Sequence, residues 1–165
     1  MALPAVDLRA GDAGAKCHQF VSDSVAALKV RRPALVVVAS SSTHYFNDSA
    51  YQFRDPRTGA IGTTPEEKAP IWEHGVASVL SQLAEAGIPT LVVHTAPHLN
   101  EDVLNWGPAT CPALRMFTDS CGSSMERIHV EQQQRPAREA EKLAVARVPG
   151  ATSADVTDDL CAEDA

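Results

Sequence analysis

The chain has 165 residues, 44% apolar and 21% charged, which is enough for one ordinary domain with its own core. Its formal charge of −7 argues against nucleic acid as a partner, because nucleic-acid binders usually present a basic face to phosphates. No apolar run reaches the roughly 20 residues that span a bilayer, and residues 1–12 have neither the basic start nor the apolar stretch of a signal peptide.

The first predicted elements are a helix and a strand. Apolar residues at helical spacing predict one stripe on the helix, formed by Phe20, Val21, Val25 and Leu28. Pro33 ends this helix. Residues 34–39 form a short apolar run rich in β-branched residues, which predicts a strand covered on both faces.

A long polar segment and a second helix follow. Residues 40–65 are rich in Ser, Asn, Asp, Pro and Gly, which predicts a surface excursion that leaves from the strand's carboxyl end. The second helix has Thr64 as a plausible N-cap and Gly87 as its C-cap. Its predicted buried stripe consists of Trp72, Val76, Val79, Leu80 and Leu83. Residues 89–95 are predicted to be a second buried strand, parallel to the first.

The last predicted elements are a helix and a weaker strand. The helix runs from near Met125 or Val130 to about Arg147, and Pro136 is expected to kink or restart it. Residues 150–158 form the third strand. Alternating helices and buried strands predict a single α/β domain with a parallel sheet. Ligands of such sheets bind beyond the carboxyl ends of the strands, where both irregular loops emerge.

The four cysteines predict no metal site, because they lack the C-x-x-C spacing and His partners of zinc ligands. Cys111 and Cys121 are ten residues apart, a spacing at which a disulfide would remove about 3 kcal/mol of loop-closure freedom from the unfolded chain. A disulfide would suit an oxidising compartment. Free buried thiols in a cytosolic protein are the alternative.

The order and spacing of several segments resemble those of one family. These segments are LPAVD, CHQFVSDSVAAL, RRPALVVVASS, WEHGVASVLSQLAEAGIPTLVVHTAP, ATCPALRMFTDSCGS and GATSADVTDDLC. Together they resemble the extracytoplasmic SGNH-type domain at the C-terminus of bacterial membrane acyltransferases (acyltransferase type 3), which acylate cell-surface sugars. The resemblance covers nearly the whole chain.

The resemblance implies a three-layer, flavodoxin-like SGNH fold with a parallel sheet and a closed Cys111–Cys121 loop on the strand-end rim. It also implies a membrane acyltransferase domain and a surface carbohydrate as partners, an extracytoplasmic location in the parent protein, and no cofactor. Cys17 is expected to lack a partner because Leu3 replaces the family's cysteine, and Cys161 is expected to be unpaired as well.

The sequence departs from the family at its catalytic motifs. SGNH-type enzymes use a Gly-Asp-Ser turn and a C-terminal Asp-x-x-His, and neither motif is present, so residues 1–165 are expected to be a partial, inactive domain without catalytic residues. Ser40 and Ser42 follow the first strand where the family places its Gly-x-Asn, which makes them oxyanion-loop candidates; ordinary turn and N-cap roles are the alternative. His44 and His98 are the histidines expected near the substrate.

Two other functions are weighed against this one. Residues 34–48 and 83–98 also resemble isochorismatase-like cysteine hydrolases, although the strand-end Asp is replaced by a serine run. Fast alkylation of Cys121 would favour that reading, and an unreactive cystine would favour the acyltransferase domain. The third reading is a non-catalytic binding remnant of the same fold.

Overall fold

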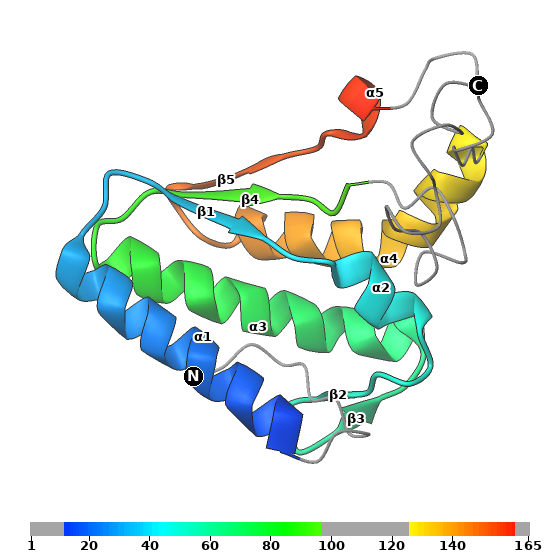
Figure 1. Cartoon of the computed structure of the whole chain (residues 1–165), viewed down its shortest axis with the longest axis horizontal. Coiled ribbons are helices and arrows are strands. Elements are labelled where there is room, and N and C mark those ends of the chain that lie inside the picture. Colours follow the sequence, from blue (N-terminus) through cyan, green and yellow to red (C-terminus); the bar gives the residue numbers. More distant parts are fainter. Residues whose placement is uncertain (1–11, 97–125, 161–165) are drawn as a thin grey trace, which may run out of the picture.

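The computed structural model describes residues 12–96 and 126–160, which form a mixed α/β fold (Figure 1). Its main sheet has the strand order β1-β4-β5. These strands are β1 (Val36–Ala39), β4 (Thr90–Val93) and β5 (Ala151–Ala154). β1 pairs with β4, and β4 with β5, in parallel, which confirms the α/β class and the parallel pairing of the first two strands. The finer SGNH-like arrangement stays a prediction.

Helix α3 (Pro65–Glu85) forms as its sequence predicts. The Thr64 side chain accepts a hydrogen bond from the backbone N–H of Glu67, whose carboxylate accepts from the backbone of Thr64, so the helix begins with a capping box. Gly87 follows the last turn with a φ of +72°, a conformation that suits glycine. The expected apolar stripe is buried at all five positions, Trp72, Val76, Val79, Leu80 and Leu83.

Helix α1 (Asp12–Arg31) packs on α3 through the middle of its predicted stripe. Val25 is buried in a cluster with Val79 and Leu83 of α3, and Val21 and Leu28 pack against that cluster. Phe20 is 71% exposed, so its assignment to the buried stripe was wrong. Val21, which was also predicted to belong to the stripe, lies one turn before Val25 and does pack against the cluster.

Helix α4 (Arg127–Ala146) runs through Pro136 as a single helix, so the proline does not restart it. The ribbon bends along its length, which is the effect expected of an internal proline (Figure 1). Small side chains on one face, Ala137, Ala140 and Ala144, let α4 approach α3 and the sheet closely. The short helix α5 (Thr157–Leu160) follows β5.

The segment predicted as a surface excursion is instead largely structured. It contains α2 (Ser42–Asn47) and a hairpin of β2 (Phe53–Arg54) and β3 (Ile61–Gly62). Phe46 and Phe53 are almost completely buried and pack edge-to-face, with ring centroids 5.3 Å apart. Burial of these two rings is the reason why a segment rich in turn-forming residues folds against α3.

Lys68 on α3 fixes the C-terminal end of α2. Its side chain is completely buried, and its ammonium donates hydrogen bonds of 3.0–3.2 Å to the backbone carbonyls of Tyr45, Phe46 and Asp48. It also lies over the Phe53 ring, 5.6 Å from the centroid. Burial lowers the pKa of Lys68, with the carboxylate of Asp48 opposing this effect. A buried cation thus satisfies carbonyls that a six-residue helix leaves open.

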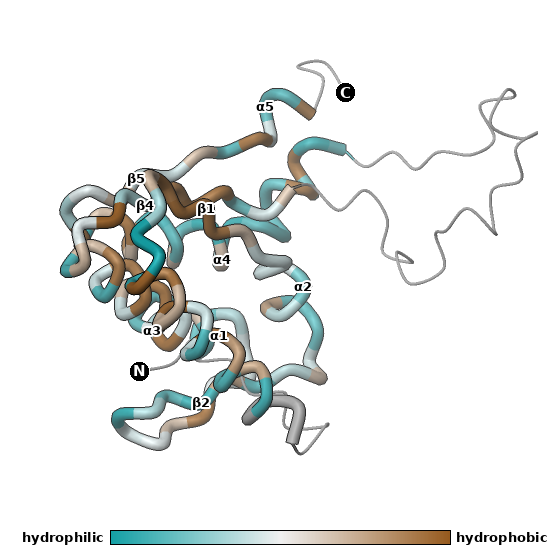
Figure 2. The backbone as a smooth tube through the Cα atoms, turned by 60° about the vertical axis from the view of Figure 1, so that its left-hand side comes forward, coloured by the Kyte–Doolittle hydropathy of each residue, from teal (hydrophilic) through white to brown (hydrophobic). Residues whose placement is uncertain are grey.

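The main sheet is covered on one face by the described helices. α1, α3 and α4 lie on the same side of it (Figure 1), and Val36 and Val92 point into that core. On the other face Val37 is 57% and Leu35 50% exposed, and Figure 2 shows this part of β1 as strongly hydrophobic. The expectation that both faces of the first strand are covered was therefore wrong for the part of the chain that the structure describes.

The β2–β3 hairpin is held at its turn by an ion pair. Arg57 donates to Asp55 from its backbone N–H at 2.8 Å and from its guanidinium at 3.2 and 3.0 Å. Asp55 is buried, and Arg57 is the partner of its carboxylate. The hydrogen bonds from Arg57 lower the pKa of Asp55 to about 2.

Because of the Asp55–Arg57 ion pair, we expect the free energy of unfolding to depend on pH in the acid range. The folded-state pKa lies below the ordinary value of 3.8, so the stability from the pair is present above that value and is lost as the pH falls through about 2. We expect the difference in unfolding free energy between wild type and Asp55→Asn to be constant above about pH 5 and to shrink between about pH 4 and 2. Urea unfolding at a series of pH values measures this difference, and a difference that does not vary with pH would contradict the assignment.

Candidate functional site

The carboxyl ends of the three parallel strands meet at one edge of the sheet. The residues that follow them are Ser40, Thr95 and Asp155, which come just after β1, β4 and β5. In open parallel sheets this is the edge at which ligands bind. Here the edge is lined by polar side chains that hydrogen-bond to one another.

Ser42 and Thr95 connect the ends of β1 and β4. The Thr95 hydroxyl donates to the Ser40 carbonyl at 2.8 Å, which leaves its oxygen to accept from the Ser42 backbone N–H at 3.0 Å and from the Ser42 hydroxyl at 2.7 Å. The Ser42 side chain is buried. Both donors of Ser42 are therefore committed, whereas no partner of the half-buried Ser40 hydroxyl lies within the described ranges.

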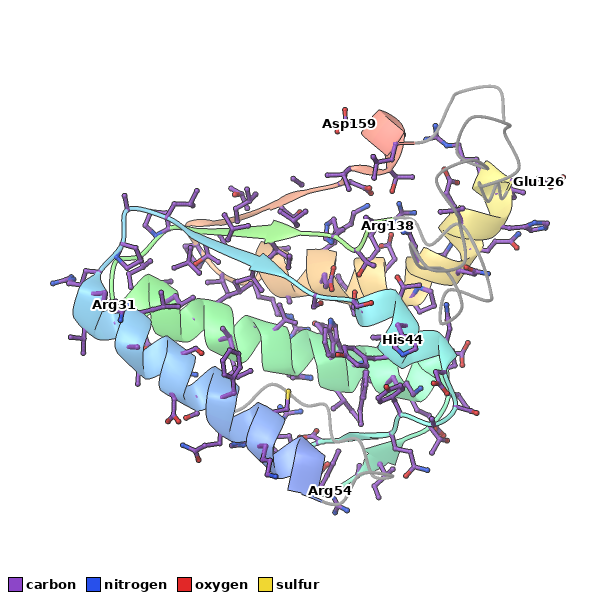
Figure 3. The ribbon with its side chains drawn as sticks, viewed as in Figure 1. Arg31, His44, Arg54, Glu126, Arg138 and Asp159 are labelled. Atoms are coloured by element: carbon purple, nitrogen blue, oxygen red, sulfur yellow. The ribbon has the colours of Figure 1, made fainter. Side chains whose placement is uncertain are left out.

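Gln134 of α4 extends this network to the start of α5, which follows β5. Its amide nitrogen donates to the Thr95 carbonyl at 3.0 Å, and its amide oxygen accepts from the Thr157 hydroxyl at 3.4 Å. One turn along the helix, Arg138, which Figure 3 labels, forms an ion pair of 2.9 Å with Asp155. α4 therefore contacts the ends of both β4 and β5 through polar side chains.

A second set of buried polar groups lies deeper in the same edge. Glu141 accepts from His94 Nδ1 at 2.7 Å and from the Trp72 indole N–H at 3.4 Å, and His94 and Glu141 are each 3% exposed. The carboxylate fixes the imidazole with its proton on Nδ1. His94 Nε2 is buried and has no hydrogen-bond partner among residues 12–96 and 126–160. Within that part of the chain, no serine or cysteine is paired with this imidazole.

Half-exposed aromatic rings flank the edge on and just after α2. The His44 and Tyr51 rings are 5.3 Å apart, and Tyr45 meets Tyr51 edge-to-face at 5.0 Å (Figure 3 labels His44). Tyr45 in turn contacts Trp72 in the core. Burial raises the pKa of Tyr45, and the neighbouring Cys17 and Tyr51 raise it further. His44 therefore lies on α2, which begins just after β1 ends, within an aromatic cluster.

Sequence reasoning missed Gln134, Arg138 and Glu141, the polar residues of α4 that face the sheet. The sequence does contain a pattern that could have identified them. The three residues stand at positions i, i+4 and i+7, so they lie on one side of the helix. That side also carries the buried alanines of α4. Polar residues at the core-facing spacing of a helix were not treated as candidates.

Several predicted residues lie outside the described residues. His98, Cys111, Cys121 and Cys161 belong to this group, so the Cys111–Cys121 disulfide and an unpaired Cys161 stay predictions. Cys17 is exposed on α1, and within the described residues it has no disulfide partner. The described ranges contain no cluster of three or more His, Cys, Asp or Glu residues suited to a metal ion.

No helix within these ranges is long and apolar enough to cross a membrane. In comparisons with known proteins, the chain matches no protein-family model, no curated protein and no solved structure. The arrangement at the carboxyl edge is therefore the basis on which a function is argued.

Proposed function

We propose that this chain is part of an SGNH-type domain of a bacterial membrane O-acyltransferase, acting on cell-surface sugars on the extracytoplasmic side. In this proposal the described residues supply the core of the domain and the edge that receives the sugar acceptor. A membrane acyltransferase domain is its partner. The serine nucleophile and its histidine base are contributed by sequence other than the described residues.

The observation that carries the proposal is the carboxyl edge of the sheet. The half-exposed rings of His44 and Tyr51 lie on and just after α2, and Thr95 binds Ser42 at the start of the same helix, just beyond the end of β1. A sugar ring has an apolar C–H face and a rim of hydroxyls, so an aromatic face next to fixed polar groups suits it. The same edge is where ligands bind in parallel sheets.

The proposal predicts that the purified chain lacks esterase activity. We expect the hydrolysis of p-nitrophenyl acetate to stay at the background rate, because Ser42 is buried and committed to Thr95 and no nucleophile faces His94 within the described residues. Ser40→Ala and Ser42→Ala are expected to leave this rate unchanged. Turnover that either substitution abolishes would contradict the assignment.

The neighbouring coding DNA provides the positive test. An acyltransferase origin predicts an adjoining reading frame, joined or frameshifted, that encodes several apolar spans and a Gly-Asp-Ser motif. Finding such a frame would support the proposal. Its absence on both sides would favour a stand-alone binding domain instead.

A further inference from the structure

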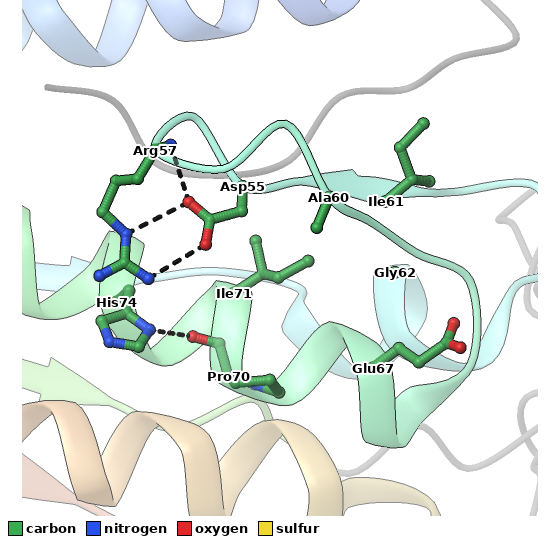
Figure 4. Close-up of a pocket in the computed structure, with 9 residues that line it drawn as sticks. All are labelled: Asp55, Arg57, Ala60, Ile61, Gly62, Glu67, Pro70, Ile71 and His74. Atoms are coloured by element: carbon green, nitrogen blue, oxygen red, sulfur yellow. Dashed lines mark hydrogen bonds and ion pairs between the residues drawn. The ribbon is translucent and has the colours of Figure 1, made fainter.

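A pocket of about 320 Å³ lies away from the carboxyl edge, between the β2–β3 hairpin and the first half of α3 (Figure 4). Its apolar lining comes from Ile71 and Pro70 on the helix and from Ala60 and Ile61 on the hairpin. Gly62 brings the two elements together, because a Cβ at this position would lie 2.8 Å from backbone atoms of Glu67. The volume is at the lower end of the range for small-ligand sites.

One end of the pocket carries a fixed hydrogen-bond donor. The guanidinium of Arg57 is half-exposed, and Asp55 holds it through its Nε and Nη2 atoms. Nη1 has no partner within the described part of the chain, so its N–H groups are available to a ligand. A donor held by a buried carboxylate loses little rotational freedom on binding.

Two acceptors complete the polar rim. His74 Nδ1 lies 2.6 Å from the Pro70 carbonyl, which only accepts, so Nδ1 carries a proton and Nε2 is the acceptor whenever the ring holds one proton. At the other end of the pocket, Glu67 uses Oε2 for its bonds to residues 63 and 64. Its Oε1 makes no hydrogen bond to the residues that the structure describes. Figure 4 shows Arg57 and His74 at one end of the pocket and Glu67 at the other.

The charges in the pocket restrict the class of ligand. Asp55 and Arg57 neutralise each other, and Glu67 leaves a single negative charge, which disfavours phosphates and carboxylates. At the other end, the N–H groups of Arg57 Nη1 can only donate, so they cannot pair with an ammonium group, which also only donates. A neutral ligand that both donates and accepts hydrogen bonds around its rim, and that has an apolar face, meets all of these conditions.

We propose that this pocket binds a neutral cyclic polyol the size of a monosaccharide, with its C–H face on Ile61 and Ile71 and its hydroxyls paired with Arg57, His74 and Glu67. The pocket shares no residue with the carboxyl edge, so the proposal does not rest on the acyltransferase assignment. If both hold, the pocket binds a further unit of the glycan whose acceptor lies at the edge.

The experiment is a titration of the ¹⁵N-labelled full chain with methyl glycosides of glucose, galactose and mannose and with N-acetylglucosamine, followed by amide chemical shifts. We expect at least one of these sugars to shift the amides of residues 55–62 and 67–74 at millimolar concentration. Arg57→Gln is expected to weaken this binding about tenfold or more, because it removes a charged donor. Arg54→Gln, an exposed arginine on the same hairpin that does not line the pocket, is the control and should bind as wild type does.

A second variant guards against loss of the hairpin in Arg57→Gln. Ile61→Glu places a charge on the partly exposed apolar wall without removing a side-chain hydrogen bond, and it should also weaken binding about tenfold or more while the hairpin amides keep their dispersion. The proposal is overturned if none of the four sugars shifts these amides at 50 mM, or if inorganic phosphate shifts them instead. Equal binding by Arg57→Gln, Ile61→Glu and Arg54→Gln would overturn it as well.

Discussion

Lys68→Met will lower the free energy of unfolding by about 3 kcal/mol, although the substitution turns a buried charge into an apolar side chain of similar length. The ammonium donates to three backbone carbonyls at the end of α2, and methionine removes this donor from all three, although the Asp48 carbonyl still accepts from the Tyr51 backbone N–H. Hydrogen bonds to charged groups are the strong ones, and an unpaired buried carbonyl has a full desolvation cost. Urea unfolding measures the loss.

The loss should be local before it is global. α2 has six residues, too few for an isolated helix to be stable in water, so its amides are expected to lose hydrogen-exchange protection in Lys68→Met. Lys142→Met on α4 is the matched control, because Lys142 is exposed, and it should change stability by less than about 0.5 kcal/mol. Wild-type stability and protection in Lys68→Met would show that Lys68 does not hold α2.

Glu141→Leu is expected to destabilise the fold by about 3–5 kcal/mol. It removes the acceptor for two buried donors, His94 Nδ1 and the Trp72 indole, neither of which has water as an alternative partner. Glu139→Leu tests the specificity of this effect, because Glu139 lies on the same helix but is exposed, and its substitution should cost less than about 0.5 kcal/mol.

The double variant His94→Leu/Glu141→Leu tests whether Glu141→Leu is costly because it leaves the buried His94 without a hydrogen-bond acceptor. If the cost of Glu141→Leu comes from leaving His94 unpaired, removing both polar groups should recover at least about 2 kcal/mol of it. Calorimetric or urea unfolding of the four proteins gives this coupling energy. Strict additivity of the two single substitutions would mean that the hydrogen bond between the two side chains contributes nothing to stability.

Elements that depend on residues close together in the sequence were predicted correctly. Thr64, the apolar stripe of α3 and Gly87 define a helix whose start, buried face and end were all confirmed. The first two strands were confirmed as parallel neighbours, since β-branched runs joined by a helix leave few alternatives.

Features that depend on distant contacts were predicted poorly. The segment around Phe46 and Phe53 was predicted as an excursion, because its turn-forming residues outweighed two aromatic rings whose partner, Trp72, lies further along the chain. Likewise, a run such as residues 36–39 does not reveal whether one or both faces of its strand are covered. In the candidate site, Ser40, Ser42 and His44 follow the carboxyl end of β1, as their order in the sequence predicted, whereas Glu141 was missed because its partner His94 lies 47 residues away.

The strand order also determines how the chain reaches its native state. Val36 pairs with Thr90, and Thr90 with Ala151, so each strand pairing closes a loop of more than fifty residues. Closing such loops loses chain entropy before the sheet contacts form, and folding is slow in proteins dominated by such pairings. We expect the helices, whose contacts are local, to form before the strands pair. During refolding from denaturant, self-association of the unpaired strand segments should then compete with their intramolecular pairing, so the yield of native protein is expected to fall as the chain concentration rises.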